Sequence, residues 1–345
     1  MQLFHLKYVD WLDSQLIYHA LPRVGIEGII ILAPNSPYVC IGYHQNLEQE
    51  VDLDYCKANN IPIFRREVGG GAVFLDGKQI FYQIILHKDN PLAQGDKSDF
   101  YRRLLEPVIK TYGDLGISTK FRPVNDVITL DGRKISGTGA ADIGDYRILV
   151  GNLIADFDYQ TMTHVLRVPD EKFRDKVFKS MTENLTTIKR EIGTLPSWDE
   201  MAKPLIHNYE KLFGELELSD LPEKVNKHIK VIKPEFLDDN WLYMKRRSKI
   251  EANTKIATGV HIIQKLHKAP GGLLKSVYEL KDSIISNLSL TGDFFCYPHE
   301  AIKDFETFLE GSELSTVSRK VENYYERFPI DTPGVTPEDW LKVML

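Results

Sequence analysis

Two arginines followed by a run of glycines form the most distinctive segment of this 345-residue chain. Arg65-Arg66 is followed after a two-residue spacer by Gly69-Gly70-Gly71, which leads into the apolar Val73-Phe74. Consecutive glycines cost backbone entropy and pack no side chain, so we expect something to approach the main chain closely there. Bare N–H groups in such a loop can hold an anion, and an arginine can complete the charge match. A tight turn between strands is the alternative interpretation of a lone glycine triplet.

Polar residues next to short apolar stretches recur further along the chain. Asn125-Asp126 precedes one such stretch, and Lys134 lies within Arg133-Lys134-Ile135-Ser136-Gly137. A lysine on a strand beside a turn is a compact point charge that can offset charge on phosphate or carbonyl oxygens. By themselves, the same residues also fit a solvated strand lysine and an Asx turn. The glycines that follow Lys134 favour function, because they leave the backbone open to a ligand.

Four segments, in this order along the chain, resemble the lipoate–protein ligase family of the biotin and lipoate ligase superfamily. They are Gly42-Tyr43-His44-Gln45-Asn46, residues 65–74, Asn125-Asp126 and residues 133–137. The resemblance implies an ATP-dependent ligase that activates lipoate to lipoyl-AMP and transfers the lipoyl group to a lysine of a lipoyl-carrier domain. Such carriers are the acyltransferase component of 2-oxoacid dehydrogenases, the glycine-cleavage H protein or a related protein.

The resemblance also implies which residues form the site for ATP, Mg²⁺ and lipoate. Lys134 is expected to be catalytic, and Asp126 is expected to bind the metal. The expected ATP-binding residues are Arg66, Gly71, Ala72, Val73, Phe74, Asn125, Asp126 and Lys134. The expected lipoate-binding residues are Tyr43, Gly69, Gly70, Lys134 and Gly137, with His44 and Asn46 as further candidates for the wall of the acyl pocket.

Three positions depart from the family pattern. Leu75-Asp76 stands where histidine–aspartate is usual, and Gly77-Lys78-Gln79 stands where leucine–glycine–asparagine is usual. Val150 precedes Gly151, where many relatives have a histidine. We expect these differences to affect metal and pyrophosphate contacts and acyl specificity.

The cysteines bear on the reaction class. Cys40, Cys56 and Cys296 are an odd, scattered set that predicts neither a disulfide framework nor a metal site. Octanoyltransferases of the superfamily carry an acyl thioester on a cysteine, and a thioester needs a thiol. No cysteine follows Lys134 on its strand or directly precedes Asn125, so adenylation is favoured. An ATP-independent octanoyl or lipoyl transferase and a non-catalytic lipoyl-binding protein are the alternatives.

The elements that must position these residues interleave strands and helices without a regular βαβ rhythm. The expected elements are helices over 8–21, 51–60, 100–115 and 198–213 and strands over 28–32, 38–42 and 61–64. Hairpins are expected around Asp76-Gly77, over 73–86, and around Asp131-Gly132, over 127–136, the latter with a type I′ turn. The fold class is therefore α+β: a large mixed-sheet catalytic domain, of the biotin/lipoate ligase type by resemblance, with a smaller α+β accessory domain.

Composition limits the remaining classes. A charged, proline-containing stretch over 215–239 indicates a connector, so we assign residues 1–244 to the catalytic domain and 245–345 to the accessory domain. The net charge of −6 argues against a nucleic-acid binder. No apolar run approaches the ~20 residues that span a bilayer, and no signal peptide is evident, so we expect a cytoplasmic protein. Residues 245–281 contain 9 basic and 2 acidic residues, which fits a solvated face or a docking surface for an acidic partner.

Overall fold

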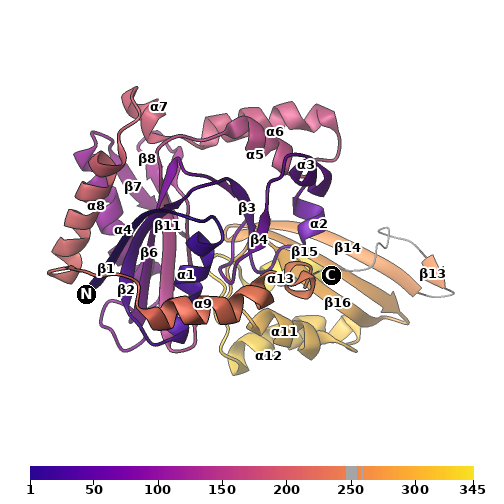
Figure 1. Ribbon diagram of the computed structural model, residues 1–345. Coiled ribbons are helices and arrows are strands. Elements are labelled where there is room, and N and C mark those ends of the chain that lie inside the picture. The colour runs from indigo at the N-terminus through magenta and orange to yellow at the C-terminus, as the bar shows by residue number, and fades with distance from the viewer. Residues whose placement is uncertain (246–254, 258–259) are drawn as a thin grey trace. The chain divides into compact units, whose positions relative to one another are not determined.

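The computed structural model describes residues 1–245, 255–257 and 260–345. The chain divides into two compact units (Figure 1). The first contains Met1–Cys40, Val51–Phe64 and Val73–Asp238, and the second contains Ile41–Glu50, Arg65–Ala72 and Asp239–Leu345. The arginine–glycine segment therefore belongs to the same unit as the C-terminus. The assignment of catalytic and accessory roles to residues 1–244 and 245–345 stays a prediction.

The first unit is built on a mixed sheet of six described strands in the order β10-β11-β6-β2-β1-β12. β1 runs parallel to β2 and β12, and the other pairs are antiparallel. β2 and β6 lie in the middle and are buried along nearly their whole length, as expected of largely apolar strands with neighbours on both sides. The strands are β1 (Gln2–Val9), β2 (Gly28–Pro34), β6 (Gln79–His87), β10 (Thr138–Ile143), β11 (Tyr146–Ile154) and β12 (Glu217–Leu218).

Two smaller sheets have the orders β4-β3-β5 and β7-β8-β9. Their strands are β3 (Tyr38–Ile41), β4 (Ile63–Arg65), β5 (Val73–Leu75), β7 (Thr119–Arg122), β8 (Asp126–Thr129) and β9 (Lys134–Ser136). The expected β8–β9 hairpin forms, but of its two turn residues only Gly132 has a positive φ, +93°, so the turn is not type I′. The expected hairpin over 73–86 is wrong, because β5 pairs with β3 whereas β6 pairs with β2 and β11. The apolar β6 is buried on both faces only in the middle of the large sheet.

Helices surround these sheets. In the first unit they are α1 (Asp13–Arg23), α3 (Leu53–Ala58), α4 (Lys97–Asp114), α5 (Tyr159–Val165), α6 (Glu171–Asn184), α7 (Ile188–Ile192), α8 (Trp198–Phe213) and α9 (Glu223–Phe236). The helix expected from Tyr8 begins later, at Asp13, because Tyr8 still belongs to β1.

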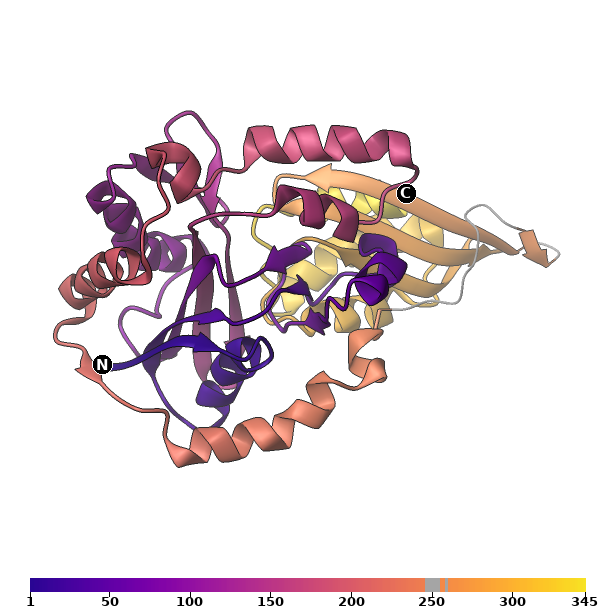
Figure 2. The same cartoon turned by 45° about the horizontal axis from the view of Figure 1, so that its top comes forward.

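The stretch expected as a connector contains α9. Pro222 stands directly before this helix, where a missing N–H removes no intrahelical bond. The buried side of α9 packs on α1, as Figure 2 shows, and the rings of Phe236 and His19 are 4.6 Å apart. The charged residues and the two prolines of this stretch therefore did not prevent helix formation, because its apolar residues pack against α1.

The second unit contains an antiparallel sheet in the order β13-β14-β15-β16. Figure 1 shows α11 and α12 along this sheet. Trp340 is fully buried in the core between the sheet and the helices, and its indole N–H donates to the Tyr325 hydroxyl at 2.6 Å. The elements of this unit are α2 (Leu47–Glu50), α10 (Asp239–Leu242), β13 (Lys255–Ala257), β14 (Val260–Ala269), β15 (Gly272–Lys281), β16 (Ile284–Gly292), α11 (Ala301–Leu309), α12 (Val317–Arg327) and α13 (Pro337–Met344).

Both units combine sheet and helix, so the α+β class is confirmed. Residues 246–254 and 258–259 of the basic stretch 245–281 lie outside the described residues. None of the described helices is both long enough and apolar enough to cross a bilayer.

Candidate active site

The predicted site residues fall into both units. The first unit contains Val73, Phe74, Asn125, Asp126, Lys134 and Gly137. The second unit contains Tyr43, Arg66, Gly69, Gly70, Gly71 and Ala72.

Lys134 is part of a three-charge cluster in the first unit. Its Nζ lies 2.7 Å from Asp126 Oδ1, and Arg122 Nη2 lies 2.7 Å from the other oxygen, Oδ2. Burial alone would raise the pKa of Asp126, but the two cations outweigh it and hold that pKa below its ordinary value. Arg122 was not predicted from the sequence, although its place directly opposite Asp126 in the β7–β8 pair is a recognisable signal.

The strand that carries Lys134 is anchored in the core by buried hydroxyl groups. Ser136 Oγ lies 2.8 Å from Tyr82 Oη, and the Tyr112 hydroxyl donates to the carbonyl oxygen of Ile135 at 2.7 Å. Tyr82, Tyr112 and Ser136 are fully buried. The backbone of Lys134 is therefore rigidly held while its side chain remains 34% exposed, which suits a group that must meet a substrate.

A cavity of about 490 Å³ lies beside Lys134. α6 contributes an apolar side to it through Val177 and Met181, which are one helical turn apart. The other lining residues are Arg122, Lys134, Lys176, Ser180, Asn184 and Leu185. The cavity combines positive charge with apolar surface, which are the two features that an acyl phosphate needs.

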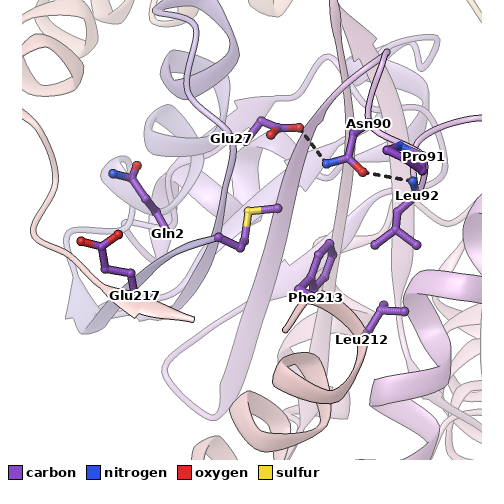
Figure 3. A pocket seen from close by; sticks show the side chains of 9 residues that line it. Gln2, Glu27, Asn90, Pro91, Leu92, Leu212, Phe213 and Glu217 are labelled. Carbon is purple, nitrogen blue, oxygen red and sulfur yellow. Dashed lines mark hydrogen bonds between the residues drawn. The ribbon is translucent and has the colours of Figure 1, made fainter. Parts of the chain in front are cut away.

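A second hollow of about 530 Å³ in the same unit is shown in Figure 3. Asn90 donates to the Glu27 carboxylate and accepts from the Leu92 N–H, both at 3.0 Å. These polar groups satisfy one another, and none of the described residues that line this hollow is a predicted site residue. The cavity beside Lys134 is therefore the candidate site.

Asn125 and Asp126 are both engaged within the protein. The Asn125 amide donates to the carbonyl oxygen of Thr138, and the Thr138 hydroxyl donates back to the carbonyl oxygen of Asn125. Among the described residues, no three His, Cys, Asp or Glu side chains cluster as metal ligands. Both oxygens of Asp126 face a cation, Lys134 on one side and Arg122 on the other. The role of Asp126 in metal binding stays a prediction.

The two arginines of the glycine segment have different roles in the second unit. Arg65 is fully buried and donates to the carbonyl oxygens of Leu242 and Tyr43, the shortest contact to each being 2.8 Å. Arg66 donates to the carbonyl oxygens of Gly69 and Gly71, at 2.8 and 2.9 Å. Arg65 therefore joins chain segments, while Arg66 closes the loop in which it was expected to contact phosphate.

The glycines of this loop are packed against another part of the same unit. Gly70 has a φ of +89°, and its N–H donates to the carbonyl oxygen of Phe294 at 3.2 Å. A Cβ at Gly69 would lie 2.7 Å from that oxygen, and a Cβ at Gly70 would lie 3.1 Å from the Phe295 ring. The sequence indicated that something approaches the main chain of this loop closely. In the structure, residues 294–295 of the same unit do so.

Tyr43 and His44 belong to an aromatic cluster in the second unit. The ring of Tyr43 lies 4.2 Å from that of His299, and His44 stacks on Phe294 at 4.6 Å. Burial, reinforced by nearby carboxylates, raises the pKa of Tyr43 to about 12. Burial and neighbouring cations hold the pKa of His44 well below its ordinary value, so this imidazole is neutral. Asn46, the other candidate for the acyl pocket wall, donates to the carbonyl oxygen of Lys245 at 3.0 Å.

All three cysteines are free and buried. Burial, with Asp52 nearby, raises the pKa of Cys56 to about 11. Burial raises the pKa of Cys296 further. Such thiols are poor nucleophiles, because the thiolate is the reactive form.

The three departures from the family pattern lie in the first unit. Leu75 pairs with Tyr38 across the β3–β5 ladder, and Lys78 lies 3.8 Å from Asp156 at the surface. Val150 lies on β11, next to Gly151. A Cβ at Gly151 would lie 2.4 Å from the Tyr82 ring, so packing within the chain accounts for this glycine.

The sequence matches the family model described as the lipoyl protein ligase A/B catalytic domain over residues 11–210. It is 32% identical over 207 residues to lipoate-protein ligase A subunit 1 of Thermoplasma acidophilum, covering 57% of this chain and 76% of that protein. It is 26% identical over 341 residues to lipoate-protein ligase LplJ of Bacillus subtilis, covering 96% and 95%. It is also 26% identical over 211 residues to octanoyltransferase LipM of Clostridioides difficile, covering 55% and 78%.

Solved structures show the same fold. A bi-partite lipoate protein ligase from Thermoplasma acidophilum superposes with a TM-score of 0.64 at 27% identity, covering 72% of this chain and 98% of that chain. LipL1 of P. falciparum superposes with a TM-score of 0.70 at 13% identity, covering 95% of both chains. A lipoate-protein ligase A has a TM-score of 0.59 at 23% identity, covering 70% and 97%. This chain therefore belongs to the lipoyl protein ligase A/B family.

Proposed function

We propose that this chain is an ATP-dependent lipoate–protein ligase. The observation that carries the proposal is the placement of Lys134, whose ammonium group pairs with Asp126 at 2.7 Å and lines a cavity of about 490 Å³. A positive charge held on a rigid strand can stabilise the charge that develops on phosphate and carbonyl oxygens. The names of the relatives support the substrates: one related structure is described as bound with ATP, and another as a complex with lipoate.

The proposed reaction has two steps. In the first, a carboxylate oxygen of lipoate attacks the α-phosphorus of ATP, and the bond to the β-phosphate oxygen breaks, which yields lipoyl-AMP and pyrophosphate. In the second, the amine of a carrier lysine attacks the lipoyl carbonyl carbon. An amide bond forms, AMP leaves with the electrons of the broken carbon–oxygen bond, and the amine releases its proton to water. Lys134 stabilises the oxygen charge in both steps.

The proposed acceptor is a lysine on a lipoyl-carrier domain. The Thermoplasma acidophilum ligase is described together with its E2 lipoyl domain, which supports this class of partner. The acyltransferase component of 2-oxoacid dehydrogenases, the glycine-cleavage H protein and related carriers are the proteins to test.

Transfer without ATP is the second candidate function. The similarity to the octanoyltransferase LipM favours it. The burial of all three cysteines, with raised pKa values for Cys56 and Cys296, argues against it, because thioester transfer needs an accessible thiolate.

A single experiment separates these functions. The protein is incubated with lipoate, ATP and Mg²⁺, with and without an apo carrier domain, and lipoyl-AMP, pyrophosphate and carrier mass are followed by mass spectrometry. The ligase forms lipoyl-AMP without the carrier and adds one lipoyl group when the carrier is present. Transfer from an octanoyl carrier in the absence of ATP, with an acyl group on a cysteine, would instead establish the transferase. Bound lipoate without turnover would indicate a non-catalytic protein.

A further inference from the structure

Two buried side-chain amides link segments that are far apart in the first unit. The N–H of Gly137 donates to Asn152 Oδ1 at 2.8 Å, and Asn152 Nδ2 donates to Gln79 Oε1 at 2.6 Å. Gln79 Nε2 in turn donates to the carbonyl oxygen of Phe74 at 3.1 Å. Gln79 is 1% exposed and Asn152 is 8% exposed, so both side-chain amides lie in the interior of the unit.

We call this series of hydrogen bonds, from Phe74 through Gln79 and Asn152 to Gly137, the amide relay. The backbone groups at its two ends determine the orientation of both side-chain amides. Gly137 contributes an N–H and Phe74 contributes a carbonyl oxygen, so Asn152 must turn its oxygen to the first and Gln79 its nitrogen to the second. Turning either amide by half a turn would place two donors or two acceptors opposite each other. Buried networks of this kind are rigid when complete and costly when broken.

The relay reaches the backbone beside Lys134. The N–H of Asn152 donates to the carbonyl oxygen of Gly137 at 3.2 Å, and the Ser136 hydroxyl donates to the carbonyl oxygen of Asn152 at 2.6 Å. A Cβ at Gly137 would lie 3.9 Å from Lys134 Cε. Asn152 therefore holds, through both its backbone and its side chain, the main chain against which the Lys134 side chain lies.

We propose that Gln79 and Asn152 are positioning residues, which fix the Gly137 backbone, and with it the Lys134 side chain, relative to Phe74. The proposal rests on the proposed function, in which Lys134 stabilises the reacting oxygens. Both ends of the relay, Phe74 and Gly137, are residues that the sequence assigned to the ATP and lipoate sites. The relay therefore couples two predicted binding segments through the interior of the sheet.

The first test is independent of any activity. Amide hydrogen exchange of the peptide containing Gly137 is compared by mass spectrometry between the wild type and Asn152→Leu, which has a similar volume and lacks both polar groups. We expect faster exchange at Gly137 in the variant, because its N–H loses its acceptor. Unchanged exchange there would overturn the relay.

The second test measures catalysis against a matched control. Asn208 is also a buried asparagine of the first unit, 3% exposed, and its amide donates to Thr111 Oγ1 at 3.2 Å and Asp114 Oδ2 at 2.8 Å. Asn208→Leu therefore removes a comparable set of buried hydrogen bonds away from the candidate site. In single-turnover formation of lipoyl-AMP, we expect the rate of Asn152→Leu to fall by roughly 10- to 100-fold, because a small displacement of the Lys134 side chain from the reacting oxygens has an effect of this size. The apparent KM for ATP should change far less than the rate.

Both variants are assayed at a temperature at which circular dichroism shows them folded. The rate of lipoyl-AMP formation by Asn208→Leu should stay within about threefold of the wild-type rate, because this substitution affects stability alone. Equal losses in the two variants, or a normal rate in Asn152→Leu, would show that the relay is only structural.

Gln79→Leu keeps the bond between Asn152 and Gly137 and removes the link to Phe74. We expect a rate between those of the wild type and Asn152→Leu. If Asn152→Leu does not fold, Gln79→Leu decides the question, because a rate equal to that of wild type would then overturn the proposal. A wild-type protein that makes no lipoyl-AMP would refute the ligase function, whereas the exchange result would still test the relay.

Discussion

Replacing Lys134 with methionine should remove activity at almost no cost in stability. The same substitution at Lys97 should lower stability and leave activity nearly unchanged. The two lysines make ion pairs of nearly equal length, since Lys134 Nζ lies 2.7 Å from Asp126 and Lys97 Nζ lies 2.6 Å from Asp142. Their exposure differs: the side chain of Lys134 is 34% exposed and that of Lys97 is 5% exposed. Methionine is an unbranched side chain one atom shorter than lysine, and it removes the ammonium group with its charge and its N–H donors.

The magnitudes follow from this difference. Removing one partner of a buried ion pair costs about 3–5 kcal/mol when the other charge is left uncompensated. Arg147 Nε still lies 3.4 Å from Asp142 in Lys97→Met, so we expect a loss of about 2–3 kcal/mol, which lowers the unfolding midpoint by roughly 5–10 °C. The Lys134 pair is partly solvated, and Arg122 still faces Asp126 in its absence, so Lys134→Met should cost about 1 kcal/mol or less. The rate of lipoyl-AMP formation should fall by about 10²–10³ in Lys134→Met, as when another preorganised charge-stabilising group is removed.

Thermal unfolding by circular dichroism and lipoyl-AMP formation by mass spectrometry measure the two effects on the same samples. Lys97→Met, assayed well below its unfolding midpoint, should turn over within a few-fold of wild type. Near-normal turnover in a folded Lys134→Met protein would refute the assigned mechanism. A large loss of stability in that variant would contradict the inference that its side chain is free to serve a substrate.

Three further predictions concern other parts of the chain. A variant with serine at all three cysteine positions should form lipoyl-AMP within a few-fold of the wild-type rate, and an acyl group found on any one of these thiols in the wild type would contradict this. Gly70→Ala should destabilise the second unit by about 1 kcal/mol or more, because a residue with a Cβ is strained at a φ of +89° and its Cβ would lie 3.1 Å from the Phe295 ring. An unchanged midpoint of urea unfolding in this variant would contradict the prediction and show that the loop adapts. The pKa of Asp126 is lower in the folded chain than in the unfolded chain. Its ion pairs therefore stabilise the folded chain fully at pH values above the unfolded-state pKa of about 3.9. This stabilisation is lost as the pH falls through the folded-state pKa. Asp126→Asn should therefore cost about 1 kcal/mol at pH 7, and urea titrations should show that this difference disappears in strong acid; a difference that persists there would exclude the charge as its cause.

Local patterns were sufficient to identify many elements. The spacing of apolar residues predicted α4 and α8, and a turn pair between two short apolar runs predicted the β8–β9 hairpin that carries Lys134. Each of these elements depends on residues within a few positions of one another. The family resemblance rests on the same kind of local segment, and the match over residues 11–210 confirms it.

Partners that lie far apart in the chain could not be predicted in this way. β5 and β6 are neighbours in sequence but pair with different strands, because the burial of a strand depends on the whole sheet. The α9 helix was missed because charge and two prolines were given more weight than the apolar residues at helical spacing, Val225, Ile232 and Phe236, which pack against α1.

The sequence by itself determined the family, the hairpin of the candidate catalytic lysine and the absence of a cysteine beside it, since each of these is written in a short segment. Only the tertiary structure decided that Arg65 is a buried link to Leu242, 177 positions away, whereas Arg66 closes the glycine loop. It also decided that Gln79 and Asn152, 73 positions apart, share a hydrogen bond. The physical reason is that a buried polar group must find a partner wherever packing places one, and packing joins residues whose separation along the chain carries no signal.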